Sequence, residues 1–96
     1  MVRVYRKKQF VIYSDLSGSY IVHNTNKEFA EGHTHLRNYK TAKFIVDLAF
    51  HKSLPKKKLS TYLYDSIIRI SNDNMYKNNI IRLRDEANKN RKCMGH

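Results

Sequence analysis

The stretch from Gln9 to His23 reads QFVIYSDLSGSYIVH, and it decides the fold more than any other part of the chain. Two runs of β-branched and aromatic residues, 9–14 and 19–23, stand on either side of a turn sequence that contains Gly18. Runs of this kind, joined by a short Gly-containing segment, are typical of an antiparallel β-hairpin. The sequence therefore predicts a hairpin over residues 9–23.

The residues on both sides of the hairpin carry a weaker strand pattern. Val2 and Val4 share the parity of the apolar residues in the first run, but Arg6 and Lys8 interrupt that face. This interruption favours an edge strand or a bend. Residues 24–32 are polar and predict a loop, whereas residues 33–36 fit either a short third strand or the lead-in to a helix.

Beyond Asn38 the apolar spacing changes from a period of two to a period of 3.6, which is typical of helices. The first stripe predicts a helix with Asn38 or Thr34 as N-cap and an end near His51 or Lys52. The end is expected there because a residue that precedes proline avoids helical backbone angles. The stripe consists of Ala42, Ile45, Val46 and Ala49.

Two further helices are predicted after Pro55. Proline suits the first turn of a helix, so the second helix is expected to begin at Pro55. Its apolar face consists of Leu59, Tyr62, Leu63, Ile67 and Ile70. Residues 71–74 form a turn sequence that caps a third helix, whose stripe is Tyr76, Ile80, Leu83 and Ala87. The apolar period ends at Asn88, so we expect a basic, frayed tail over residues 89–96.

Together these elements predict a single α+β domain over residues 1–88. An antiparallel β-hairpin of two or three strands packs against three amphipathic helices, because each element offers one apolar face to a common core. A chain of 96 residues has room for one modest core and no more. The predicted core consists of Phe10, Ile12, Ile21, Ile45, Val46, Leu63, Ile67, Ile80 and Leu83.

The net charge is the strongest indication of function. The chain has 19 Lys and Arg against 8 Asp and Glu, which gives a net charge of +11. Residues 33–64 hold seven basic residues and one acid, Asp47, for a net charge of +6. Such an excess favours an anionic partner, either nucleic acid or an acidic protein, although a purely solubilising surface is the plainer alternative.

The composition also bears on location and origin. Cys93 is the only cysteine, which excludes an internal disulfide and suits a reducing compartment. No apolar segment follows the first residues and none approaches the length of a membrane span, so we expect no signal peptide, no membrane partner and a cytoplasmic location. Lys, Asn, Ile and Tyr account for 36 residues, and their AT-rich codons point to a low-GC bacterium or its phage.

Clustered basic residues are the predicted nucleic-acid contacts. Each phosphate neutralised by Lys or Arg releases condensed counterions, so such clusters bind without regard to sequence. The helix expected to begin at Pro55 would add its N-terminal amides. Asp85 and Glu86 argue against insertion of the third helix into a groove. The candidate residues are Lys40, Lys43, Lys52, Lys56, Lys57, Lys58, Lys77, Arg82 and Arg84.

Aromatic residues in the strands form a second candidate surface. If Tyr5, Tyr13 and Tyr20 share one sheet face, they would stack on unpaired bases. The alternative is that these tyrosines are ordinary parts of a half-buried sheet. No ribonucleoprotein-type aromatic motif is present in the sequence.

The histidines are the only residues that suggest catalysis. His33 and His35 share one side of an extended segment, and His23 or His51 would complete a zinc site. However, the sequence has no cysteine pair and no HExxH motif. We therefore expect no metal, no cofactor and no catalytic residue, and we keep a metal-dependent nuclease or phosphoesterase using His33 and His35 as an alternative.

These observations favour a small, nonenzymatic nucleic-acid-binding protein that contacts phosphates through residues 40–58 and the third helix. The alternative is a protein-interaction module, a small regulator or inhibitor encoded by a phage or mobile element, that docks on an acidic partner protein.

Overall fold

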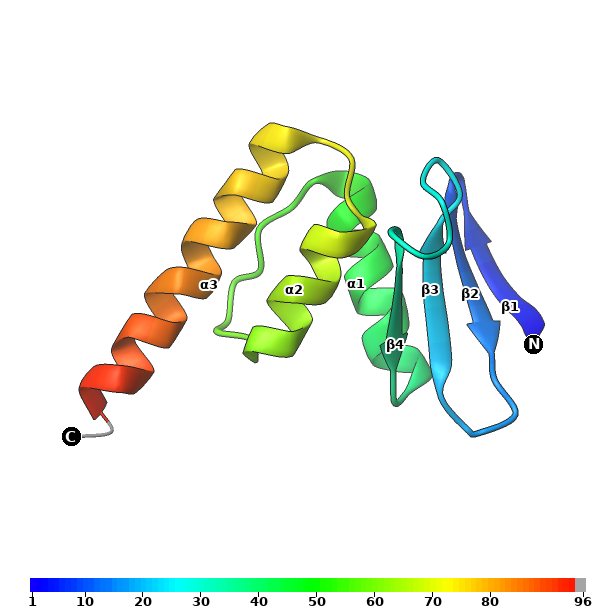
Figure 1. The fold of residues 1–96 in the computed structure, drawn as a ribbon, viewed down its shortest axis with the longest axis horizontal. Helices are drawn as coiled ribbons and strands as arrows, with labels where there is room; N and C mark the ends of the chain where they lie inside the picture. Colours follow the sequence, from blue (N-terminus) through cyan, green and yellow to red (C-terminus); the bar gives the residue numbers. More distant parts are fainter. Residues whose placement is uncertain (95–96) are drawn as a thin grey trace.

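The computed structural model describes the backbone of residues 1–94 and the side chains of residues 1–89. Four strands come first: β1 (Val2–Lys7), β2 (Phe10–Ser14), β3 (Tyr20–Asn24) and β4 (His33–Leu36). Three helices follow: α1 (Tyr39–His51), α2 (Thr61–Ile70) and α3 (Asn74–Met94). The α+β class and the order of strands and helices are as predicted (Figure 1).

The strands form one antiparallel sheet in the order β1-β2-β3-β4, so each strand pairs with its neighbour in sequence. The predicted hairpin corresponds to β2 and β3, and Gly18 in its turn has a positive φ of 87°. The sheet has four strands where two or three were predicted, because β1 is a separate strand. A tight turn with Lys8 at φ 54° joins β1 to β2, and the pairing is irregular between Arg3 and Tyr5.

Strand β4 lies at one edge of the sheet, and α2 covers that edge. Arg69 of α2 donates its Nε–H to the His33 carbonyl at 2.6 Å and its NH2 group to the Ala30 carbonyl at 2.7 Å. The Tyr62 hydroxyl donates to the His35 carbonyl. Every second residue of an edge strand turns its backbone groups outward, so these side chains satisfy carbonyls that lack a neighbouring strand.

Helix α1 begins and ends where the sequence predicts. The Asn38 side chain accepts a hydrogen bond from the Thr41 amide at 2.8 Å and caps the first turn. Lys52 ends the helix in the left-handed conformation, and its amide bonds back to the Ala49 carbonyl. The three helices follow the sheet on one side, with α3 farthest from the strands (Figure 1).

The predicted start of α2 at Pro55 was wrong, because the helix begins at Thr61 with Ser60 as its N-cap. A helix that began at Pro55 would hold three lysines in its first turn, where the helix dipole disfavours positive charge. Ser60 instead accepts a hydrogen bond from the Leu63 amide at 3.3 Å. Residues 53–60 form a connection, and Leu59 lies in it rather than on the helix.

The core lies between the sheet and the helices. Of the predicted core residues, Leu63 and Leu83 are half-buried at its border, and the fully or nearly fully buried members are Phe10, Ile12, Ile45, Val46, Ile67 and Ile80. The placement of Ile21 in this core was wrong. Ile21 is buried, but its position in β3 turns it to the opposite face of the sheet from Val22, which is a core residue.

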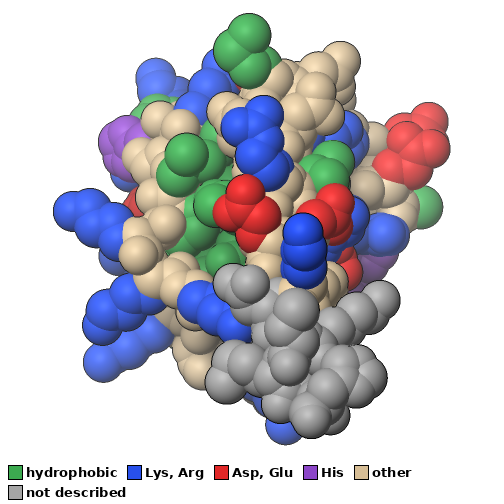
Figure 2. Space-filling view, turned by 90° about the vertical axis from the view of Figure 1, so that its left-hand side faces the viewer, with side chains coloured by type: hydrophobic (Ala, Val, Ile, Leu, Met, Phe, Trp, Pro, Cys, Tyr) green, Lys and Arg blue, Asp and Glu red, His purple; other side chains and the backbone are tan. Residues whose placement is uncertain are grey.

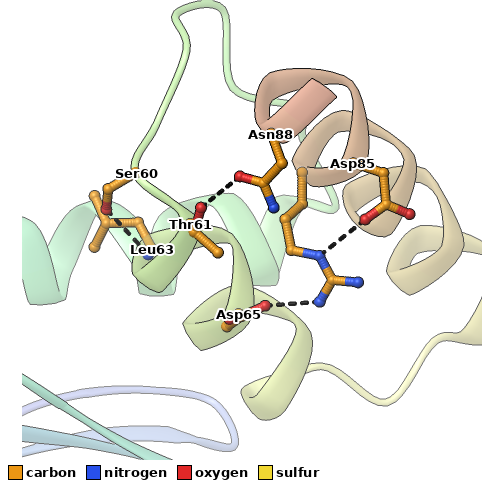
Figure 3. A network of polar contacts seen from close by, with 7 residues as sticks. Ser60, Thr61, Leu63, Asp65, Asp85 and Asn88 are labelled. Carbon is orange, nitrogen blue, oxygen red and sulfur yellow. Dashed lines mark hydrogen bonds and ion pairs between the residues drawn. The ribbon is translucent and has the colours of Figure 1, made fainter. Parts of the chain in front are cut away.

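Helix α3 packs against α2 and carries the predicted stripe, since Tyr76, Ile80 and Ala87 are buried. Two polar links hold the pair together: Arg84 bonds to Asp65, and Thr61 donates to Asn88 at 2.7 Å (Figure 3). The helix extends through Met94, beyond the expected end at Asn88. Residues 95–96, and the side chains from 90 onward, of the predicted tail lie outside the described residues.

Candidate nucleic-acid interface

One face of the sheet carries side chains that the helices do not cover. Cross-strand partners point to the same side of a sheet, so the pairing register assigns each residue to a face. Two rows of four residues lie on the side away from the core, and together they are called the open sheet face. Read from β1 to β4, the rows are Arg6–Val11–His23–His33 and Arg3–Tyr13–Ile21–His35.

Both rows have the same chemical order. Each begins with an arginine on β1 and ends with a histidine on β4. The aliphatic residues Val11 and Ile21 are only 2% and 4% exposed, although they lie outside the core cluster. We infer that neighbouring side chains on this face bury them, since arginine stems and aromatic rings cover apolar surface well. None of the four strands contains Asp or Glu, so the face carries only neutral and positive groups.

Phe29 adds a ring to this face from the loop between β3 and β4. Its ring stacks on the His33 ring with centroids 4.2 Å apart and an interplanar angle of 8°. It also meets the His23 ring at 5.2 Å, and the His33 and His35 rings lie 5.0 Å apart. Phe29 is exposed. The four rings therefore form a continuous aromatic cluster at the β4 end of the open sheet face.

Backbone carbonyls orient two of these histidines. His33 Nδ1 contacts the Phe29 carbonyl, and His23 Nε2 contacts the Lys27 carbonyl at 3.0 Å. A carbonyl oxygen only accepts, so each of these ring nitrogens carries the hydrogen. In the neutral rings, His33 Nε2 and His23 Nδ1 are then acceptors. The rings are held in place as flat, partly exposed surfaces.

Two pockets adjoin the β4 end of the face. One, of about 600 Å³, is lined by His35, Arg37, Tyr62 and other residues around the start of α1. The second, of about 330 Å³, lies between β4 and α2, and Asp65 and Arg69 line it together with His33 and His35. Arg37 is exposed and lines the first of these pockets together with His35. The β4 end of the open sheet face therefore adjoins two pockets whose lining residues include hydrogen-bond donors and acceptors.

Several of the predicted cationic contacts are engaged within the protein. Lys43 Nζ lies 5.1 Å from the centroid of the Tyr5 ring. Lys52 pairs with Asp73 at 3.0 Å, and the pKa of Asp73 is lowered by a hydrogen bond from the Tyr76 amide and then by Lys52. Such pairs reduce the charge that these groups offer to a ligand.

Arg84 is held in the same way between two helices. Its guanidinium pairs with Asp65 of α2 at 2.7 Å and with Asp85 of α3 at 3.2 Å (Figure 3). The hydrogen bond with Asp65 is the main cause that raises the pKa of Arg84. This residue links α2 to α3 and is poorly placed to read a base.

The other predicted cations lie on the helical side of the molecule. Lys40 and Arg82 are exposed on α1 and α3, and Lys77 is half-buried on α3. Lys56, Lys57 and Lys58 are exposed in the connection that follows α1. Lys56, Lys57 and Lys58 lie together, but α1, which is about 20 Å long, separates them from Lys40 in its first turn. None of the nine predicted residues belongs to the open sheet face.

The predicted tyrosine surface was wrong as a set of three. Tyr5 and Tyr20 lie on the helix-covered face, where their rings meet Tyr39 at 6.4 and 5.8 Å. Only Tyr13 lies on the open sheet face. Arg3, Arg6 and Phe29 were not predicted as functional residues, and His23 was considered only as a zinc ligand. Alternation in the hairpin places His23 beside Val11, on the side opposite Phe10 and Ile12. Alternation alone would put Arg3 and Arg6 on opposite faces, and the irregular pairing between Arg3 and Tyr5 brings both to the open sheet face.

Within the part of the chain that the structure describes, no three His, Cys, Asp or Glu side chains are arranged to hold a metal ion. None of the helices, over the described residues, has both the length and the apolar character needed to cross a bilayer. No protein-family model, curated protein or solved structure matches this chain.

Proposed function

We propose that this protein binds single-stranded nucleic acid without catalysis, through the open sheet face. The observation that supports the proposal is the pair of rows in which arginine, apolar or aromatic residues and histidine follow one another across all four strands. Unpaired bases stack on exposed rings, and the guanidinium groups of Arg3 and Arg6 would neutralise the phosphates beside them. The net charge of +11 supports an anionic ligand of this kind.

A single strand suits this surface better than a duplex. Bases within a duplex stack on one another and present only their edges, so exposed rings add little to duplex binding. Four strands spaced about 4.8 Å apart span roughly 14 Å, which matches the two or three bases that a four-stranded sheet of this kind holds. We therefore assign base contacts to Tyr13, Phe29 and His35, and phosphate contacts to Arg3, Arg6 and Arg37.

The first test measures fluorescence anisotropy of labelled oligonucleotides at about 50 mM salt, where electrostatic binding is strong. Single-stranded RNA, single-stranded DNA and a duplex of equal length are compared. Tyr13→Ala and His35→Ala should each weaken binding to the single strands by roughly 5- to 150-fold, because a stacked base contributes about 1–3 kcal/mol.

Phe44→Ala is the matched control, because Phe44 is an exposed aromatic residue on α1 and lies outside the open sheet face. This variant should bind like the wild type. Binding that prefers the duplex, or that is equally weakened by Phe44→Ala, would contradict the assignment to the open sheet face. No binding of any oligonucleotide by the wild type would contradict the function itself.

A further inference from the structure

An apolar groove lies on the helical side of the molecule, away from the open sheet face. Its volume is about 430 Å³, and α1 and the connection after it form its walls. Phe44 is 42% exposed and Leu54 is 49% exposed, and because both line the same groove they form a contiguous apolar patch. The lining residues are Phe44, Leu48, Ser53, Leu54, Pro55, Lys56, Lys57 and Leu59.

The rim of this groove is positively charged. Lys56 and Lys57 line it directly, and Lys58 follows in the chain. Within the described residues, no Asp or Glu lines the groove, and none of the three lysines forms an ion pair. From the side of α3, hydrophobic side chains are visible at the surface beside Lys and Arg side chains (Figure 2). The groove therefore combines an apolar floor with uncompensated positive charge.

Hydrogen bonds fix the walls of the groove before any ligand arrives. The Tyr76 hydroxyl contacts the carbonyls of Leu48 and Ser53 at 3.2 and 2.8 Å, and the Ser53 amide donates to the Leu48 carbonyl at 3.0 Å. At the other end, the Leu59 amide donates to the Tyr64 hydroxyl at 3.0 Å. The connection is therefore anchored at both of its ends. A preformed site loses less conformational entropy on binding.

We propose that this groove is a docking site for an acidic, amphipathic segment of a partner protein. Apolar side chains of the segment would fill the space between Phe44 and Leu54, and its carboxylates would pair with Lys56, Lys57 and Lys58. This arrangement follows the helix-in-groove mode of recognition, in which apolar anchors give affinity and charge gives orientation. The inference is independent of the proposed nucleic-acid site, because it concerns a different face.

Charge also decides against two other occupants. A second copy of this chain carries a net charge of +11, and its eight acids are scattered so that only Asp85 and Glu86 are adjacent. Nucleic acid would pair with the lysines and stack a base on Phe44, but it would leave the aliphatic side chains of Leu48, Leu54 and Leu59 without a matching apolar group. An acidic segment with apolar anchors would contact the apolar floor of the groove and would also pair with the lysines on its rim.

The experiment selects random peptides of about 12 residues, displayed on phage, for binding to the wild-type protein. Leu54→Ser and a Lys56→Glu/Lys57→Glu double variant serve as counter-targets. We expect enrichment of peptides in which Asp or Glu flanks large apolar residues. Synthetic versions should lose at least about tenfold in affinity against each groove variant, because Leu54→Ser removes an apolar contact and Lys56→Glu/Lys57→Glu replaces attraction by like-charge repulsion.

Two control variants distinguish binding in the groove from nonspecific hydrophobic or electrostatic binding elsewhere on the surface. Leu16→Ser removes a leucine that is 99% exposed in the turn between β2 and β3, and Arg3→Glu reverses a charge on the open sheet face. Both should bind the selected peptides like the wild type. Circular dichroism of each variant shows that the fold is intact.

Three results would overturn the docking proposal. The first is a selection that yields no peptide dependent on Leu54, and the second is enrichment of peptides without acidic residues. The third is a Lys56→Glu/Lys57→Glu variant that weakens oligonucleotide binding and leaves peptide binding unchanged, which would place these lysines in the nucleic-acid site. Loss of oligonucleotide binding in Arg3→Glu with retained peptide binding would separate the two proposals.

Discussion

The two faces of the sheet use alternate residues of the same strands for different purposes. Ile12 and Tyr13 are neighbours in sequence, yet Ile12 is fully buried under the helices and Tyr13 is half-exposed on the open sheet face. The covered face is built from aliphatic and aromatic packing and a few satisfied polar groups. The open face has rings, guanidinium groups and no acids. The core packing and the proposed recognition surface are thus separated by a shift of one residue along a strand.

The covered face should be sensitive to the loss of a single side chain. Ile67 of α2 is fully buried in the core. Ile67→Ala should lower the free energy of unfolding by about 2–5 kcal/mol, the range for removing a large core side chain and leaving a cavity. Urea denaturation followed by circular dichroism measures this change. A loss below roughly 0.5 kcal/mol, the size of an ordinary surface effect, would mean that α2 does not depend on this face.

A polar residue on the covered face should show the next largest effect. Asn24 is fully buried, donates to the Ile70 carbonyl at 2.8 Å and accepts from the Asn26 amide at 2.9 Å. Asn24→Ala should cost about 1–3 kcal/mol, because buried backbone groups would lose their partners. Asn26→Ala, an exposed change in the same loop, is the control for the same denaturation experiment. Equal effects of the two variants would contradict this role of Asn24.

Tyr76 should make part of the stability dependent on alkaline pH. Burial raises the pKa of Tyr76 from 10.0 to about 12, so the folded protein favours the neutral hydroxyl. The stability that this preference contributes is present below pH 10.0 and is lost as the pH rises from there to about 12.

Tyr76→Phe removes the ionisable group and its bonds to the Leu48 and Ser53 carbonyls. The variant should be less stable by about 1 kcal/mol at neutral pH, and its deficit should shrink as the pH passes 10. Denaturation midpoints of both proteins across this range give the difference. A deficit that stays constant would contradict the buried, neutral state of Tyr76.

The open sheet face should show the smallest change in stability. Arg3→Gln and Arg6→Gln, combined, should alter the free energy of unfolding by no more than about 0.5 kcal/mol, because both residues are exposed. If both contact phosphates of a single strand, the slope of log K against log salt should become shallower by about 1.4 units. An unchanged slope would show that the phosphates lie elsewhere, with the exposed lysines of residues 40–58 as the alternative.

The sequence was most informative where a period runs over many residues. The β2–β3 hairpin and the limits of α1 were correctly predicted, because alternation and helical spacing are local properties. Strand β4 was ambiguous, since four residues reading HTHL are too few to show a period. Its strand conformation depends on pairing with β3, which the local sequence does not encode.

The candidate site was harder to predict because faces are assigned by tertiary packing. Alternation alone places His23 and Val11 on one side of the hairpin, but it does not say which side the helices will cover. The start of α2 was wrong because the sequence offers two starting signals, Pro55 and Ser60, and the three lysines between them favour the later one. Phe29 joins the open sheet face from a loop, and no periodic pattern places a loop residue.

The hydrogen bonds that α2 makes to the β4 edge are absent during the first part of translation. The sheet is a meander, so residues 1–36 contain every strand and can pair as soon as they leave the ribosome. Arg69 and Tyr62, which satisfy the outer carbonyls of β4, are synthesised roughly 25 to 35 residues later. At about 5–20 residues per second, the edge is bare for some seconds during each round of translation. Nascent chains on neighbouring ribosomes would meet in this interval, before α2 closes the edge to further strands.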